Sequence, residues 1–429
     1  MPYFPPLKVT SEDIETSAVL RHHLGDRTPV TMHTNVGLAR RRRIAGADWN
    51  GVRGVAFSPD GRYLAVTSFE ADAVEIMDVP SLTRVARVSG PSFNGARGVA
   101  FSPDGRYLAV ASSNANAVEI MDVPSLTRVA RVSGTDWGYA WGVAFSPDGR
   151  YLAVASHGAD AVEIMDVPSL ARVARVTGAD WDGAWDVAFS PDGRYLAVSL
   201  LLADAVEIMD VPSLARVARV TGADWDGAWD VAFSPDGRYL AVALQNVDAV
   251  EIMNVPSLTR VARVSGPSFN GARGVAFSPD GRYLAVVSYF ADAVEIMDVP
   301  SLTRVARIEG IDWDGAWDVA FSPDGRYLAV VSYFADAVEI MQGLTIYEQT
   351  LLGGISLSVA AGGTLLVPAG IYYCTLGANT QAQFYDDVNA VWRTFIGNGG
   401  AGLIISNGAN VRLYNSGTTD ETSILRRWV

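Results

Sequence analysis

One pattern of apolar and polar positions recurs along most of the chain. The string FSPDGRYLAV begins at Phe57, Phe101, Phe145, Phe189, Phe233, Phe277 and Phe321, always 44 residues apart. Each period holds four short, Val- and Ile-rich runs that alternate with a period of two, and turn residues separate them. Four strands in about 44 residues are typical of one propeller blade, whereas the frequent turns argue against a helical solenoid. The pattern predicts an all-β chain with a seven-bladed β-propeller over residues 38–343.

The four strands can be followed within a single repeat. Residues 98–102, 106–112, 117–123 and 127–132 predict the inner, second, third and outer strands in turn. Pro-Asp-Gly after the first strand and Pro-Ser after the third are turn sequences, because proline presets φ and glycine accepts positive φ. Arg128 and Arg131 of the fourth run suit the wetter outer edge of a blade.

The seventh repeat is incomplete, and this predicts how the ring closes. It reaches its third strand at 337–341 but lacks a fourth, while LARRRRIAG at 38–46 aligns with SLTRVARVSG of the complete repeats. We expect this N-terminal strand to pair with the last blade and so remove the free edges. The chain then divides into an N-terminal arm (1–37), the propeller (38–343) and a β-rich, sandwich- or barrel-like module (344–429). The two ends would leave from neighbouring strands and form a second small domain.

Composition narrows the function classes. The 429 residues include 49% hydrophobic ones, enough for a large core, and carry a formal net charge of −14. Nothing resembles the basic footprint that nucleic acid requires, and no apolar run reaches the length of a membrane span. The single cysteine, Cys374, excludes an intrachain disulfide. We therefore expect neither nucleic acid nor a membrane as partner.

The repeats carry a family resemblance. The unit VAFSPDGRYLAVAS…NAVEIMDVPSLTRVARV resembles the YVTN and lactonase-like propellers, and more distantly the Trp-Asp repeats. This resemblance implies the fold but leaves the function open, since such propellers include enzymes, scaffolds and surface proteins.

The flanks resemble a second group of proteins. Pro-Ala-Gly at 368–370, Gln-Phe-Tyr-Asp at 383–386, Trp392-Arg393 and Asn-Gly-Ala-Asn-x-Arg at 407–412 look like a β-rich module of bacteriophage virion proteins. The resemblance implies a non-enzymatic virion structural protein: a capsid decoration, neck or tail component. Such a protein would be a homo-oligomer that contacts other virion subunits through residues 1–37 and 344–429.

Differences among the repeats predict a binding face. The SPDG turn is constant and the VPSL turn varies only conservatively, whereas the loops at the opposite ends of the strands vary. Aromatic and arginine side chains gather in these loops and form the candidate binding set: Trp141, Trp185, Trp229, Trp317, Arg53, Arg97, Arg273, Tyr289, Phe290, Tyr333 and Phe334. Flat apolar area with polar edges suits a host-surface glycan or protein.

The loops that join the fourth strand of one repeat to the first strand of the next carry two aromatic positions, for which we expect different roles. At the first position, as in Trp181, we expect the side chain to pack between adjacent blades. The second is tryptophan in Trp185 but arginine in Arg97, and a switch between apolar and charged residues favours the surface or the mouth of the pore.

The chain offers little for catalysis. The repeated Asp of SPDG is expected to cap its own turn rather than bind calcium. No nucleophile elbow, phosphate loop or dinucleotide fingerprint occurs. We predict no catalytic residue, no cofactor and no metal. Two alternatives remain: a cytoplasmic propeller scaffold for protein–protein contacts, and a lactonase-like enzyme with polar residues converging on the pore.

Overall fold

The computed structural model describes residues 39–45, 48–309 and 314–342, and the backbone of eight strands between 355 and 428. The chain divides into two compact units, Asn35–Ile346 and a second that combines Met1–Thr34 with Tyr347–Val429. The predicted arm, residues 1–37, lies outside the described residues. No helix in the described part of the chain is long and apolar enough to cross a membrane.

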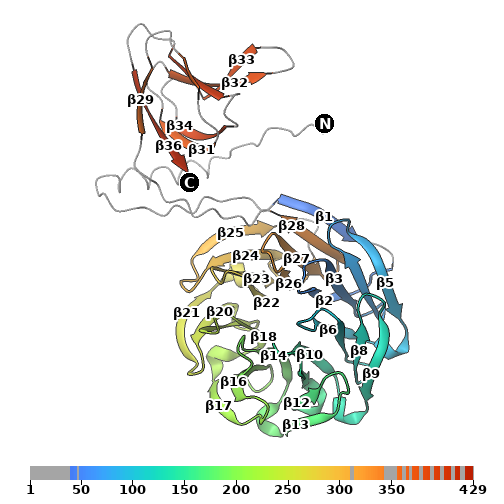
Figure 1. The fold of residues 1–429 in the computed structure, drawn as a ribbon. Coiled ribbons are helices and arrows are strands. Elements are labelled where there is room, and N and C mark those ends of the chain that lie inside the picture. Colours follow the sequence, from blue (N-terminus) through green and yellow to red (C-terminus); the bar gives the residue numbers. More distant parts are fainter. Residues whose placement is uncertain are drawn as a thin grey trace. The chain divides into compact units, whose positions relative to one another are not determined.

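The first unit is a ring of seven four-stranded antiparallel sheets, as the 44-residue repeat predicts (Figure 1). The inner strands, which surround the central axis, are β2 (Val52–Phe57), β6 (Ala96–Phe101), β10 (Ala140–Phe145), β14 (Ala184–Phe189), β18 (Ala228–Phe233), β22 (Ala272–Phe277) and β26 (Ala316–Phe321). The outer strands are β5 (Thr83–Ser89), β9 (Thr127–Ser133), β13 (Arg172–Thr177), β17 (Arg216–Thr221), β21 (Thr259–Ser265), β25 (Arg304–Glu309) and β1 (Ala39–Ala45). The fold prediction is confirmed.

Two further strands lie between the inner and outer strand of each blade. The second strands are β3 (Tyr63–Ser68), β7 (Tyr107–Ser112), β11 (Tyr151–Ser156), β15 (Tyr195–Leu200), β19 (Tyr239–Leu244), β23 (Tyr283–Ser288) and β27 (Tyr327–Ser332). The third strands are β4 (Ala73–Asp78), β8 (Ala117–Asp122), β12 (Ala161–Asp166), β16 (Ala205–Asp210), β20 (Ala249–Asn254), β24 (Ala293–Asp298) and β28 (Ala337–Gln342). Short 3-10 helices occupy the loops: η1 (Pro91–Phe93), η2 (Thr135–Trp137), η3 (His157–Ala159), η4 (Ala179–Trp181), η5 (Ala223–Trp225) and η6 (Pro267–Phe269).

The N-terminal strand closes the ring. β1 pairs antiparallel with β28, so that Ile44 lies opposite Val338 and Arg43 opposite Glu339, and the last sheet has the order β1-β28-β27-β26. Arg43 also donates a 3.2 Å hydrogen bond to the Ala335 carbonyl oxygen. The strand missing from the seventh repeat is therefore supplied from the front of the chain, as predicted.

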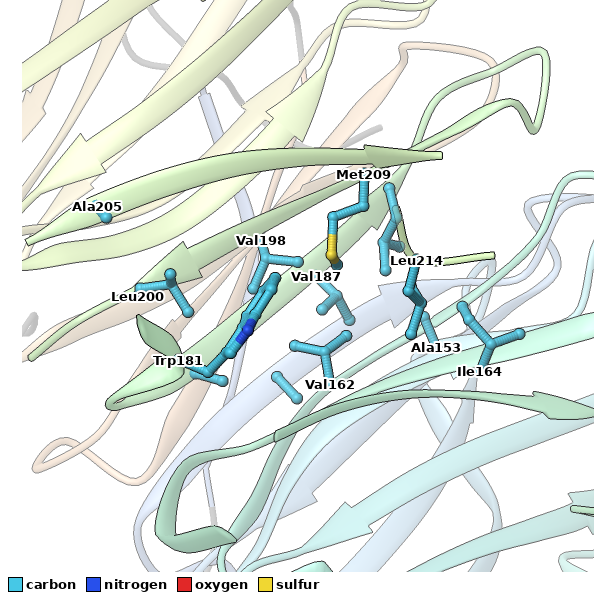
Figure 2. Close-up of a cluster of buried hydrophobic side chains, with 13 residues drawn as sticks. Ala153, Val162, Ile164, Trp181, Val187, Val198, Leu200, Ala205, Met209 and Leu214 are labelled. Carbon is cyan, nitrogen blue, oxygen red and sulfur yellow. The ribbon is translucent and has the colours of Figure 1, made fainter. Parts of the chain in front are cut away.

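The core lies between neighbouring blades. In Figure 2, Trp181 of η4 packs in a cluster with Val162 of β12 and with Val198 and Leu200 of β15. This side chain therefore fills the gap between the third and fourth blades. The prediction that the first aromatic of each loop packs between blades is confirmed for Trp181, and the equivalent residues Trp49, Phe93, Trp137, Trp225 and Phe269 are buried as well.

Each third strand buries a glutamate. These side chains are at most 1% exposed and are Glu75, Glu119, Glu163, Glu207, Glu251, Glu295 and Glu339. In the third blade, Arg172 Nε lies 2.7 Å from Glu163 Oε2, and Arg175 Nη1 lies 3.2 Å from Glu163 Oε1. Burial raises the pKa of Glu163, and the hydrogen bond from Arg172 limits the rise. Arg128 and Arg131 are exposed on the outer strand β9, as predicted, and likewise pair with the buried Glu119.

The constant face is built from self-contained turns. In the first blade, Asp60 Oδ1 accepts hydrogen bonds from Ser58 Oγ at 2.6 Å and from the Arg62 N–H at 3.0 Å. Ser58 Oγ in turn accepts the Tyr63 N–H at 2.8 Å. The hydrogen bond from Ser58 lowers the pKa of Asp60. These contacts explain why the SPDG sequence is constant, because each side chain completes the turn itself.

The second unit contains two four-stranded antiparallel sheets, ordered β29-β36-β31-β34 and β30-β35-β32-β33. The strands are β29 (Ile355–Val359), β30 (Thr364–Leu366), β31 (Gly370–Thr375), β32 (Thr380–Asp386), β33 (Val391–Ile396), β34 (Ala401–Ser406), β35 (Val411–Asn415) and β36 (Glu421–Trp428). Along the chain, the strands alternate between the sheets except at β32 and β33, which form a hairpin. This strand order is that of a jelly roll.

Candidate binding site at the mouth of the propeller channel

The variable loops lead into the inner strands, and the second residue of each inner strand lies at the mouth of the channel. These residues are Arg53, Arg97, Trp141, Trp185, Trp229, Arg273 and Trp317. With the residues that follow them on each strand, they line a cavity of about 140 Å³. The seven residues at the mouth that sequence analysis singled out are therefore brought together around one cavity.

Three tryptophans from consecutive blades form one arc of the mouth, and the fourth, Trp317, lies between Arg273 and Arg53 in the order of the blades. The ring centroids of Trp141 and Trp185 are 3.5 Å apart, those of Trp185 and Trp229 are 4.0 Å apart, and Trp229 lies 5.9 Å from Trp317. His157 stacks on Trp141 at 4.2 Å. Burial lowers the pKa of His157, so its ring is neutral at pH 7.

Three arginines form the rest of the mouth, each held against aromatic rings. The guanidinium carbon of Arg273 lies 3.5 Å from the ring centroid of Tyr289. Arg53 lies 3.6 Å from Phe69, and Arg97 lies 3.9 Å from Trp141. Burial lowers the pKa of Arg273 to about 10 and also lowers that of Arg53. All three side chains remain cationic at neutral pH.

Four aromatic residues from the sixth and seventh blades form a rim beside the arginines. Phe290 and Phe334 are 61% and 58% exposed, and each has its ring 4.9 Å from that of the preceding tyrosine, Tyr289 or Tyr333. Both tyrosine rings also contact Trp317, at 5.5 and 5.2 Å. The rim predicted from the sequence is thus continuous with the mouth and presents exposed apolar area beside it.

Half-buried carboxyl groups lie one residue further along three inner strands. Asp318 accepts hydrogen bonds from its own blade at Val319 N–H (2.7 Å) and from the first blade at Val55 N–H (3.0 Å). Asp230 likewise accepts Val231 N–H and, from the next blade, Val275 N–H, at 2.9 and 2.8 Å. These carboxyl groups connect neighbouring blades.

The environment of these carboxyl groups favours their protonated forms. Burial raises the pKa of Asp318 to about 7. It raises the pKa of Asp230 well above its ordinary range, and the charge of the adjacent Asp186 adds to that effect. Asp186 and Asp230 form a hydrogen bond with each other, so one proton shared between them stabilises the pair.

Phe69 and His157 were not among the predicted site residues, although both lie at the mouth. Phe69 in TSFEAD and His157 in ASHGAD align with Tyr289 and Tyr333 in VSYFAD. An alignment of the loops between the second and third strands of each blade would have identified Phe69 and His157. Asp186, which follows Trp185, is half-buried and forms hydrogen bonds with backbone N–H groups and with Asp230.

The described residues contain no group of three His, Cys, Asp or Glu side chains placed to hold a metal ion. The acidic residues nearest the cavity are engaged with the backbone and with one another. The chemistry that the mouth offers is therefore stacking on aromatic rings and donation of hydrogen bonds from cationic side chains.

Comparison with known proteins supports the assignment of the fold. Residues 26–213 match the family model described as "Lactonase, 7-bladed beta-propeller". No curated protein sequence matches the chain. The resemblance of the repeats to lactonase-like propellers is thus confirmed over these residues.

Solved structures show the same architecture. The chain is similar to Kuenenia stuttgartiensis hydrazine synthase, with 22% identity and a TM-score of 0.62 over 72% of this chain and 99% of that one. It is also similar to the Cps50 (Swd1) β-propeller domain of Myceliophteria thermophila, with 18% identity and a TM-score of 0.62 over 72% of this chain and 100% of that one. At these identities the likeness concerns the fold alone.

Proposed function

We propose that this protein is a non-enzymatic structural component of a bacteriophage virion, a capsid decoration, neck or tail protein, whose propeller presents its variable face to a host-surface glycan or protein. The observation that carries the binding role is the contrast between the two faces of the ring. One face repeats a self-contained turn, in which Asp60 and Ser58 satisfy their own loop. The other gathers cationic and aromatic side chains with unsatisfied hydrogen-bond donors around a cavity.

The strand order of the second unit supports a place in a virion. Two four-stranded sheets with jelly-roll connections occur in viral capsid and lectin domains. The segments Gln383–Asp386 and Trp392-Arg393, which resemble a phage module, fall on the hairpin of β32 and β33. In this proposal, residues 1–37 and 344–429 attach the protein to other virion subunits in several symmetric copies.

Mass spectrometry of purified phage particles tests the virion role. The protein should be present in a fixed, multicopy ratio to the major capsid protein and should stay with particles through a density gradient. Its absence from particles, with the protein present in the soluble fraction of the host, would contradict this proposal and favour a cytoplasmic scaffold.

A lactonase-type enzyme is the second candidate, because of the family model that matches residues 26–213. The titratable side chains at the mouth of the channel give little support to a lactonase activity. His157 stacks on Trp141 and lies edge-on to Trp185, and the carboxyl groups of Asp230 and Asp318 are occupied by backbone donors. Hydrolysis of a lactone by the full-length protein, lost on Arg273→Gln, would support this enzyme and contradict the binding role.

A further inference from the structure

Three positive charges converge on one ring at the mouth of the channel. The guanidinium carbons of Arg273, Arg53 and Arg97 lie 4.0, 4.5 and 5.7 Å from the centroid of Trp317. No ion pair joins any of these arginines to an acidic side chain among the described residues. Like charges brought together in a partly desolvated place raise the free energy of the folded state. A bound anion would lower it.

The same arginines carry hydrogen-bond donors without acceptors. The Nε atoms of all three, and Nη1 of Arg53 and Arg273, are buried and have no partner among the described residues. Arg273 is only 7% exposed and lines the cavity. A buried donor left unsatisfied costs about 1–3 kcal/mol, and more when it is charged. Arg53 and Arg273 also make side-chain hydrogen bonds with Tyr333 and Tyr289, but the buried Nε and Nη1 donors remain available to an acceptor inside the cavity.

The acidic residues of the cavity cannot serve as that acceptor. Asp318 and Asp230 each accept two backbone N–H groups, and Asp186 forms a hydrogen bond with Asp230. Burial raises the pKa of all three, so they offset only part of the charge of the three arginines. The cavity keeps an excess of positive charge and of donors, which selects an anion from outside the chain.

We propose that the cavity binds the carboxylate of an acidic sugar, with Arg53, Arg97 and Arg273 as its donors and the rim of Tyr289, Phe290, Tyr333 and Phe334 against the sugar ring. Guanidinium groups match the planar carboxylate. The volume, about 140 Å³, admits one small group, so the remainder of a glycan lies against the exposed rim. A monoanion fits better than a phosphate dianion because Asp186, Asp230 and Asp318, which line the same cavity, already supply part of the compensating negative charge.

This inference rests on the proposed function, since it names the chemistry that the variable face recognises. The test is calorimetric titration of the full-length protein with glucuronate, glucose and inorganic phosphate, with tryptophan fluorescence as a second readout. Glucuronate should bind saturably and quench or shift the emission of the tryptophans at the mouth, and glucose should not bind. Equal binding of glucose, phosphate binding as tight as that of glucuronate, or no binding of glucuronate would each overturn the proposal.

Matched variants locate the site. Arg273→Gln and Arg97→Trp should each weaken glucuronate binding about tenfold, the effect of losing one charged hydrogen bond. Arg97→Trp introduces a residue that this chain already uses at the equivalent position in Trp141, so folding is retained. Arg106→Gln, exposed on the opposite face, should bind as the parent does. Unchanged affinity in Arg97→Trp overturns the proposal, and a protein that assembles into particles without binding glucuronate overturns this inference alone.

Discussion

The third residue of each inner strand is either glycine or aspartate. At this position the backbone of the next blade comes close, and the two residue types accommodate it in different ways. At Gly54 and Gly98, a Cβ would lie 2.2 and 2.1 Å from a carbonyl oxygen of the next blade, so only glycine fits. Asp318 instead bridges to the next blade through Val55 N–H. The bridge buries a carboxyl group and thereby makes the stability of the ring depend on pH.

Asp318→Gly tests that dependence. Burial raises the pKa of Asp318 from 3.8 to about 7, so the folded state keeps a proton that the unfolded state has lost. The contribution of Asp318 to the stability of the folded state is fully present below the pKa that this residue has in the unfolded chain. It is lost as the pH rises to about 7, at up to about 1.4 kcal/mol per pH unit. Urea unfolding between pH 4 and 8 should show a shallower decline in the variant. An identical slope would contradict the account. Some slope should persist, because Asp186 and Asp230 still titrate.

Trp181 provides a second test at this scale. Trp181→Ala should lower the free energy of unfolding by about 3–5 kcal/mol, because it leaves a cavity between two blades. Trp181→Phe is the control, since the chain places Phe93 and Phe269 at the equivalent positions, and should cost less than about 1.5 kcal/mol. If denaturant unfolding gave the same loss of unfolding free energy in both variants, the indole side chain of Trp181 would not fill the gap between the blades.

The outer strand of each blade is fixed by charge as well as by its backbone ladder. Glu163 of β12 is buried and forms ion pairs with Arg172 and Arg175 of β13, which are themselves partly exposed to solvent. The alternation of AVEIM places this glutamate on the expected side of the strand, but periodicity does not reveal that neighbouring elements cover it. The sequence correctly indicated an exposed outer edge for Arg128 and Arg131, but it did not show that these arginines pair with a buried carboxylate on the neighbouring strand.

Removal of the two arginines and removal of the Glu163 charge should lower the free energy of unfolding by different amounts. Arg172→Ala with Arg175→Ala leaves a buried charge and should cost about 3–5 kcal/mol near pH 7, with part of the loss recovered at low pH as Glu163 protonates. Glu163→Gln leaves partly exposed arginines that water can solvate and should cost less. Denaturant unfolding at pH 5 and pH 7.5 measures both. A larger loss in Glu163→Gln would contradict the assignment.

The ring as a whole depends on one long-range pairing. β1 covers the free edge of β28 and places Ile44 opposite Val338. Deletion of residues 1–45 should therefore lower the free energy of unfolding by several kcal/mol, a large share of the roughly 5–15 kcal/mol typical of a protein. Deletion of residues 1–37 keeps β1 and serves as the control. Equal stability of the two truncated chains by thermal unfolding would show that the propeller does not need this strand.

The sequence was sufficient for the blades and for ring closure, because seven repeats at one constant spacing and one missing strand admit a single arrangement. It also identified the loops that carry Trp185 and Arg97. It could not show that Arg53, Arg97 and Arg273 converge on Trp317, since a repeat pattern does not fix the direction of side chains across the channel. Nor could it separate Asp186, which lines the cavity, from Asp180 and Asp182 of the same loop, which are exposed.

Binding of the full-length protein to cells of the host bacterium is the most direct test of a variable recognition face on a constant scaffold. The parent protein and Arg106→Gln, altered on the constant face, should bind equally. Arg97→Trp, altered at the mouth, should bind about tenfold more weakly. Equal binding by all three proteins, or a loss confined to Arg106→Gln, would contradict the account.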